Sequence, residues 1–251
     1  MGTYAAVVLA GGAARRMGGV DKPALPVGGR PMRDRVLAAV ADATPRVLVG
    51  AADAVPAGVR VVREDPPGGG PVAAAAAGLA LLDPDTALVA LLAADLPLLT
   101  RAAIGDLLHH LTDPGPETEP AGPDADLGPD ADLGRDADLG RDADLGRDAD
   151  PGRDADPGPD ADTDSAGPDG ACFVDGDGRR QSLCGVWRVA SLRAALHRLT
   201  VERDGTLSGA PVRALLAGLV VREVAWSGEG PPPWFDCDTD EDVRRAEEWA
   251  R

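Results

Sequence analysis

Residues 4–24 read YAAVVLAGGAARRMGGVDKPA, and this stretch decides the fold class. The run Tyr4–Ala10 is continuously apolar, which is typical of a strand buried on both faces of a parallel sheet. The strand gives way to Gly11 and Gly12, and a long loop punctuated by glycine follows. A buried strand that leads into such a loop predicts an α/β domain whose ligand binds beyond the carboxyl end of the strand.

The flanking sequence continues this alternation of strands and helices. Further strands are predicted at residues 46–50, 59–63, 86–93, 181–189 and 220–226. Helices are predicted at residues 32–41, 71–82, 101–111, 192–199, 211–218 and 239–251. This order predicts a three-layer α/β fold with a doubly wound, mostly parallel sheet, as in Rossmann-like domains. We expect residues 1–112 and 171–251 to form one domain.

The segment between these two parts is an acidic insertion, residues 113–170. Its central part, residues 123–162, repeats the units PDADLG, RDADLG and RDADPG. Each unit offers at most one leucine among Asp, Gly and Pro, which is too little apolar surface to offset the cost of ordering the backbone. We therefore expect disorder there. The insertion holds 19 acidic residues and 4 arginines of a chain whose net charge is −17, so the remainder is close to neutral.

Composition also excludes several classes of protein. The acidic balance disfavours nucleic acids and anionic membranes as partners, and few aromatic residues are present to stack on bases. The three cysteines lack CxxC spacing, which argues against a disulfide framework or a structural zinc site. No apolar run approaches the roughly 18 residues that cross a bilayer. We expect a cytoplasmic protein with reduced thiols.

The first candidate site is the loop after the first strand. The backbone of Gly11 and Gly12 can approach phosphate oxygens closely, while Arg15, Arg16 and Lys22 can neutralise a polyphosphate. The loop is neither a Walker A motif nor a GxGxxG fingerprint. From the residues alone, a tight turn remains the alternative to a phosphate site.

Carboxylates supply the second and third candidate sites. Asp95, in AADLPLLT, follows a buried strand, where it can hold Mg²⁺ against substrate phosphates or merely open a turn. Near the C-terminus, Asp236 and Asp238 in WFDCDTDED can face a metal together. Alternatively, Asp238 or Thr239 is the N-cap of a helix, and Glu241 or Asp242 completes a capping box.

These segments together resemble a known family. LAGGAARRMGGVDKPALPVGGRPM, residues 9–32, is similar to the signature of the molybdenum cofactor guanylyltransferases, a branch of the Rossmann-like nucleotidyltransferases. The likeness extends to VVREDPPGGGPVAAAAAGL, LLAADLPLLT, RRQSLCGVWR and WFDCDTDEDVRRAEEW, and so covers the chain except for residues 113–170.

The resemblance implies transfer of GMP from GTP to the terminal phosphate of molybdopterin or Mo-molybdopterin, with Mg²⁺ as cofactor and pyrophosphate as the second product. It implies contact with the nucleotide by a group of residues that comprises Leu9, Ala10, Gly11, Gly12, Lys22, Asp65 and Asp95. Asp95 would ligate Mg²⁺ with Asp238 as a second candidate ligand, and Arg15 and Arg16 would stabilise the departing pyrophosphate.

Three positions depart from the family pattern. Gly50 stands where an asparagine is frequent, Ala74 replaces a glycine, and residues 236–239 read DCDT in place of NxNT. Two alternative functions therefore stay open. One is a related cytidylyltransferase, or a nucleotidyltransferase for another phosphorylated acceptor. The other is a non-catalytic GTP-binding protein that serves molybdoenzyme apoproteins or their chaperones.

Overall fold

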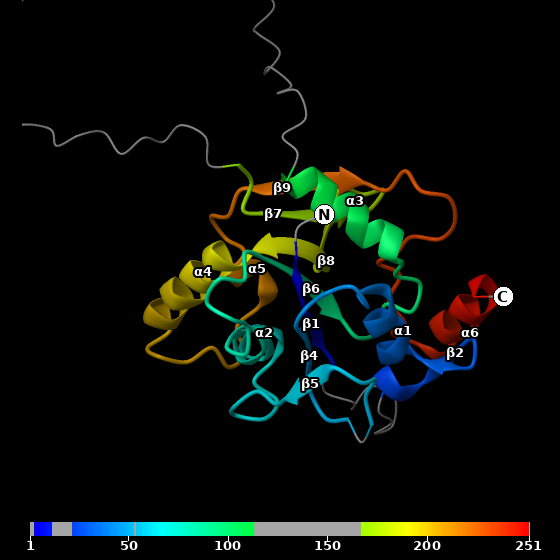
Figure 1. Cartoon of the computed structure of the whole chain (residues 1–251), viewed down its shortest axis with the longest axis horizontal. Coiled ribbons are helices and arrows are strands. Elements are labelled where there is room, and N and C mark those ends of the chain that lie inside the picture. Colours follow the sequence, from blue (N-terminus) through cyan, green and yellow to red (C-terminus); the bar gives the residue numbers. More distant parts are fainter. Residues whose placement is uncertain (1–2, 12–21, 53, 113–166, 251) are drawn as a thin grey trace, which may run out of the picture. The chain divides into compact units, whose positions relative to one another are not determined.

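The computed structural model describes residues 3–11, 22–52, 54–112 and 167–250. Its central feature is a seven-stranded sheet with the strand order β5-β4-β1-β6-β8-β7-β9 (Figure 1). The strands of this sheet are β1 (Ala5–Leu9), β4 (Arg46–Val49), β5 (Val59–Val62), β6 (Leu88–Ala93), β7 (Gly170–Val174), β8 (Arg180–Arg188) and β9 (Val221–Ala225). Strands from both sides of the acidic insertion therefore join one sheet.

The first strand is central, as its composition predicts. All five residues of β1 are buried, and β1 pairs in parallel with β4 on one side and with β6 on the other. β4 in turn pairs in parallel with β5. The carboxyl ends of these four strands therefore share one edge of the sheet, which is where α/β folds bind their ligands.

One strand runs against the others. β8 pairs antiparallel with both β6 and β7, whereas β7 and β9 are parallel to each other. β7 was not predicted from the sequence: Gly170 falls within the expected insertion, and the other four residues of β7 directly follow it. The expected βαβ order is thus wrong at this point: β7 and β8 form a hairpin, in which a turn at residues 175–178 joins adjacent antiparallel strands.

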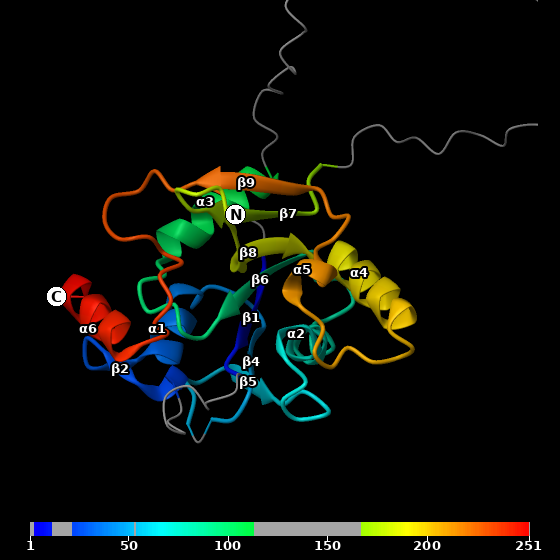
Figure 2. The same ribbon diagram turned by 180° about the vertical axis from the view of Figure 1, so that it is seen from behind.

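Helices cover both faces of the sheet, as predicted for a doubly wound fold (Figures 1 and 2). One face packs against α1 and α3, and the other packs against α2, α4 and α5. The bounds are α1 (Met32–Ala39), α2 (Pro71–Leu79), α3 (Arg101–Thr112), α4 (Val189–Glu202), α5 (Val212–Leu215) and α6 (Asp240–Trp249). The fold class predicted from the sequence is therefore confirmed.

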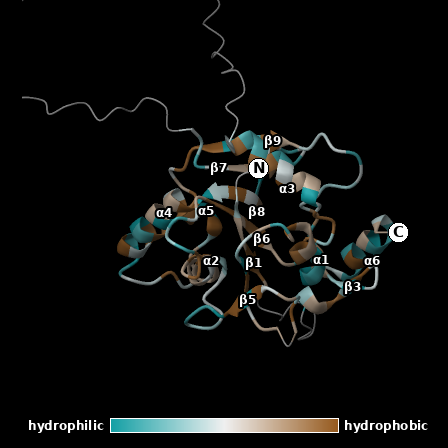
Figure 3. Cartoon of the chain, viewed as in Figure 1, coloured by the Kyte–Doolittle hydropathy of each residue, from teal (hydrophilic) through white to brown (hydrophobic). Residues whose placement is uncertain are grey.

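Peripheral elements complete the described structure. A short hairpin of β2 (Pro26–Val27) and β3 (Arg30–Pro31) lies beside α6, which forms a small apolar cluster with it through Val27 and Ala246. Hydrophobic and hydrophilic residues alternate around α4 and α6 in Figure 3, as expected of amphipathic surface helices. Within the described ranges, no helix is long and apolar enough to cross a membrane. Residues 113–166 of the predicted insertion lie outside those ranges.

Candidate active site

Three charged side chains from distant parts of the sequence meet beyond the carboxyl ends of the parallel strands. The Lys22 ammonium donates to Asp95 Oδ2 at 2.6 Å and to Asp238 Oδ1 at 2.7 Å. Two of these residues follow β1 and β6, and the third precedes α6. The structure therefore brings together Lys22, Asp95 and Asp238, which the sequence singles out separately.

Local structure explains why each carboxylate faces the lysine. Asp95 follows β6 by two residues, and its carbonyl accepts a hydrogen bond from the Cys237 amide at 3.3 Å. Thr239, not Asp238, is the N-cap of α6, and it forms a capping box with Asp242. Since Thr239 satisfies the helix end, the Asp238 carboxylate is left to bind Lys22.

The two carboxylates offset the effect of burial on the pKa of Lys22. Burial alone would lower the pKa of Lys22, but hydrogen bonds to Asp238 and Asp95 raise it above its ordinary value. The side chains of Lys22 and Asp95 are 18% and 24% exposed, whereas that of Asp238 is 62% exposed. The Asp95 contact is therefore the less screened of the two, and Lys22 remains a cation at neutral pH.

The two residues before Asp238 differ in their surroundings, and burial raises the pKa of each. Burial, together with the nearby carboxylates of Asp238 and Asp95, raises the pKa of Asp236. Cys237 points away into an apolar cluster with Met32 and Leu98, and burial raises the pKa of its thiol to about 12. Cys237 thus anchors the segment that carries Asp236 and Asp238, while its thiol stays protonated.

The donor set suits a hard divalent cation that is also held by phosphates. Within the described residues, no group of three or more His, Cys, Asp or Glu side chains is arranged to hold a metal ion. Asp95 and Asp238 do, however, present carboxylate oxygens to one shared cation, the Lys22 ammonium. Mg²⁺ in proteins is commonly bound by one or two carboxylates plus substrate phosphates, so these two residues fit that role.

Glu64 is a site residue that was not predicted from the sequence. It is the buried charged residue of the described core, with 8% of its surface exposed. Its Oε1 accepts a hydrogen bond from the Gly68 amide at 3.0 Å, and a Cβ at Gly11 would lie 3.3 Å from that oxygen. The carboxylate is therefore hydrogen-bonded within the loop after β5 and lies close to Gly11, where the loop after β1 begins. The sequence could have indicated Glu64, because it directly follows the strand predicted at residues 59–63 and so stands at the ligand-binding edge.

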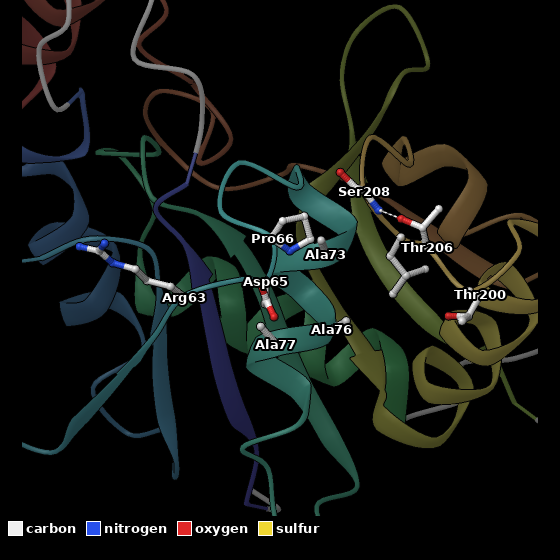
Figure 4. Close-up of a pocket in the computed structure, with 11 residues that line it drawn as sticks. Arg63, Asp65, Pro66, Ala73, Ala76, Ala77, Thr200, Thr206 and Ser208 are labelled. Carbon is white, nitrogen blue, oxygen red and sulfur yellow. Dashed lines mark hydrogen bonds between the residues drawn. The ribbon is translucent and has the colours of Figure 1, made fainter.

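Asp65, the acidic residue predicted at this position, lies apart from Glu64. It is exposed and lines a pocket of about 380 Å³ beside α2, which is closed on the other side by Thr206 and Ser208 of the connection from α4 to α5 (Figure 4). Successive residues of an extended chain point to opposite sides, which explains why only one of the two acidic residues faces Gly11. The structure thus places Asp65 in a pocket of its own, outside the cluster around Lys22.

The structure describes some, but not all, of the remaining residues that were predicted to contact the nucleotide. Leu9 is the buried end of β1, and the Ala10 amide donates to the Val49 carbonyl at 2.7 Å. Gly11 is exposed at the ligand-binding edge. Gly12, Arg15 and Arg16 lie outside the described residues, so their expected roles stay predictions.

The structure gives physical reasons for two departures from the family pattern. Gly50 has a φ of +145°, and a Cβ there would lie 2.9 Å from the carbonyl carbon of Ala10. A side chain does not fit at this position. Where the family frequently has an asparagine, this chain instead brings the backbone of Gly50 close to the backbone of Ala10. Ala74 is 2% exposed, and its methyl group packs in the core beneath the N-terminal half of α2.

Known proteins show what this chain is similar to. Residues 6–123 match the family model described as a MobA-like NTP transferase domain. No curated protein sequence matches the chain. One similar structure is 4-diphosphocytidyl-2C-methyl-D-erythritol synthase from Anaerococcus prevotii, at 12% identity and a TM-score of 0.57, with 98% of this chain and 97% of that chain covered.

Two further structures widen the comparison. Molybdopterin-guanine dinucleotide biosynthesis protein A from Archaeoglobus fulgidus is 16% identical at a TM-score of 0.55, with 97% of this chain and 96% of that chain covered. A homologue of Mycobacterium tuberculosis Rv0371c from Mycobacterium sp. strain JC1 is 18% identical at a TM-score of 0.57, over 98% and 96%. These identities establish the fold. The family model, which covers residues 6–123, matches the type of nucleotidyltransferase that the sequence resemblance implied.

Proposed function

We propose that the protein transfers GMP from GTP to the terminal phosphate of molybdopterin or its molybdenum-loaded form, and releases pyrophosphate. The observation that carries this proposal is the Lys22 ammonium held between Asp95 and Asp238 at the ligand-binding edge of a MobA-like domain. The similar Archaeoglobus fulgidus protein is named for molybdopterin-guanine dinucleotide biosynthesis, which supports this product.

The reaction needs charge neutralisation and positioning more than covalent catalysis. An oxygen of the acceptor phosphate attacks the α-phosphorus of GTP, and the bond from that phosphorus to the bridging oxygen of the β-phosphate breaks. The bonding electrons leave with pyrophosphate. Because the attacking phosphate is already anionic, no general base is required.

Different residues of this chain would bind the phosphates, the metal ion and the nucleoside. Lys22 would bind the phosphates of GTP, and Asp95 and Asp238 would hold Mg²⁺, which supplies Lewis-acid neutralisation of phosphate charge. Leu9, Ala10, Gly11 and Gly12 would contact the nucleotide. Asp65 would lie near the guanosine, and Arg15 and Arg16 would stabilise the departing pyrophosphate.

A cytidylyltransferase is the second candidate. The Anaerococcus prevotii protein is a diphosphocytidyl-methylerythritol synthase by name, and it is as similar in fold as the molybdopterin protein. The paired Gly11 and Gly12 resemble the guanylyl branch and favour GTP over CTP. The chemical step is the same for both nucleotides.

Pyrophosphate release tests the proposal. The protein is incubated with Mg²⁺ and GTP, CTP or ATP, with and without molybdopterin or its molybdenum-loaded form. Release that requires both GTP and the pterin is the expected result. Release with CTP alone among the nucleotides would replace the proposed product with a cytosine dinucleotide, and GTP binding without release would favour a non-catalytic accessory protein.

A further inference from the structure

A second cavity lies at the same edge of the sheet as the candidate active site. It has a volume of about 430 Å³ and lies between the start of α3 and the connection from β9 to α6. Leu98, Thr100 and Trp226 line it together with Trp249 of α6. A cavity of this volume is within the range that binds small molecules.

The strand order separates this cavity from the nucleotide residues. Gly11 and Glu64 follow β1 and β5, which belong to the β5-β4-β1 half of the sheet. The cavity is formed by segments that follow β6 and β9, in the other half. Asp95 follows β6, the strand next to β1, and thus stands at the division between the halves. Leu98, in the wall of the cavity, is three residues further along the chain.

Aromatic side chains are concentrated around the cavity. The whole sequence has 4 Trp, 2 Phe and 1 Tyr, and five of these residues are in this region. Phe173 packs against the indoles of Trp226 and Trp234, at 5.6 and 5.3 Å between ring centroids. Phe235 packs edge-on against Trp249 at 5.0 Å. Each of the two indoles that line the cavity, Trp226 and Trp249, thus packs against a phenylalanine.

Two charged side chains, Arg35 and Glu229, accompany these rings in the cavity wall. Arg35 Nε donates to the Pro97 carbonyl at 2.7 Å and its Nη1 to the Val27 carbonyl at 3.3 Å, which fixes the guanidinium in the cavity wall. Trp226 Nε1 is buried, and Gly228 lies against the same indole, so this N–H is not open to the cavity. The exposed carboxylate of Glu229 also lines the cavity and can accept hydrogen bonds there.

We propose that this cavity binds the acceptor of the transfer reaction as a flat, nitrogen-rich heterocycle that carries an anionic arm. Its ring would pack against the indoles of Trp226 and Trp249, since flat aromatic groups gain from such contacts. Arg35 would offset the negative charge of the arm, and the exposed Glu229 carboxylate, which also lines the cavity, would accept from N–H groups of the ring. The phosphate arm would extend along Leu98 toward Asp95. This assignment rests on the proposed function.

The test uses pterin-6-carboxylate, a flat anionic heterocycle, as the probe in equilibrium dialysis against the full chain. Ala102 is an exposed residue of the cavity wall at the start of α3, so Ala102→Phe fills the cavity without disturbing the core. Ala217→Phe is the matched control, because Ala217 is likewise exposed and lines a different cavity, of about 490 Å³. Trp249→Leu removes a partly exposed indole and provides a second variant.

The expected result is that Ala102→Phe and Trp249→Leu each weaken pterin binding at least about tenfold, while Ala217→Phe leaves it unchanged. GTP affinity, measured in parallel, stays the same in all three variants and shows that each is folded. Absence of pterin binding to the unmodified protein, or equal binding by Ala102→Phe, would overturn the assignment.

The same variants separate this inference from the proposed function. If pterin binding depends on the cavity but no GMP transfer is detected, the transfer proposal fails and the binding site stands. If GMP transfer is detected and Ala102→Phe retains the same KM for the acceptor, the transfer proposal stands and the cavity is not the acceptor site.

Discussion

The Nζ atom of Lys22 lies 2.6 Å from Oδ2 of Asp95, although the two residues are 73 positions apart in the sequence. This contact joins the loop after β1 to the end of β6, two strands that pair in parallel at the centre of the sheet. Asp238 binds the same ammonium from the opposite end of the chain. The two carboxylates hold a cation at the edge of the sheet where α/β folds bind their ligands.

Lys22→Ala should lower the rate of GMP transfer at least about a hundredfold, because it removes the cation that neutralises phosphate charge. It should also cost about 1 kcal/mol of folding stability, since it leaves Asp95 and Asp238 near each other without their shared counter-ion. Steady-state kinetics and thermal unfolding measure the two effects. Unchanged turnover in Lys22→Ala would remove the lysine from the mechanism.

Glu64→Ala should destabilise the protein by about 1–3 kcal/mol, because it leaves the amide of Gly68 without its partner. Glu64→Gln retains an acceptor oxygen and should recover most of that loss. Asp65→Ala is the control, since Asp65 is exposed and should alter the unfolding free energy by less than about 0.5 kcal/mol. Equal unfolding midpoints in urea for Glu64→Ala and Asp65→Ala would contradict the role given to Glu64.

Gly50→Asn restores the residue frequent in the resembling family, yet it should destabilise this protein by more than about 2 kcal/mol. The backbone at Gly50 has a φ of +145°, and a Cβ there would meet the Ala10 carbonyl group. Gly68→Asn is the matched control: Gly68 has a φ of +80°, and no atom lies within 4 Å of its would-be Cβ. Thermal unfolding should rank Gly50→Asn well below Gly68→Asn, and the reverse order would refute the packing argument.

The thiols should be unreactive in the native protein at pH 8. Burial raises the pKa of Cys172 to about 11 and that of Cys237 to about 12, and it also raises the pKa of Cys184. A raised pKa keeps each thiol protonated below that value, and the thiolate is the reactive form. Titration with a disulfide reagent should detect none of the 3 cysteines before unfolding and all of them in guanidinium chloride. A rapidly labelled thiol in the native protein would contradict this burial.

Much of the fold was predictable because the relevant signals are local. The apolar run that became β1 is buried at all five positions, and the predicted strand at residues 59–63 corresponds to β5 at Val59–Val62. β7 was missed because five residues beside a long polar repeat carry little periodicity of their own. Without β7, the sequence offered no sign that β8 runs antiparallel in a hairpin.

The candidate site was predictable residue by residue, but its assembly was not. Lys22 and Asp95 were singled out by the loop and strand that precede them. The contact of Lys22 with Asp238 spans 216 positions and depends on Thr239 taking the N-cap of α6. Glu64 and Asp65 both follow β5, so the sequence marks both as candidates, but it does not record which of them the backbone turns toward Gly11.

The most direct measurement is the transfer of label from [α-³²P]GTP to molybdopterin, with Mg²⁺ present or removed by chelation, for the unmodified chain and Asp95→Asn. We expect a labelled guanine dinucleotide product and free pyrophosphate with Mg²⁺, and a loss of at least about a hundredfold on chelation or in Asp95→Asn. Label that remains in GTP under all these conditions, with both substrates bound, would contradict the central claim that this site transfers a nucleotide.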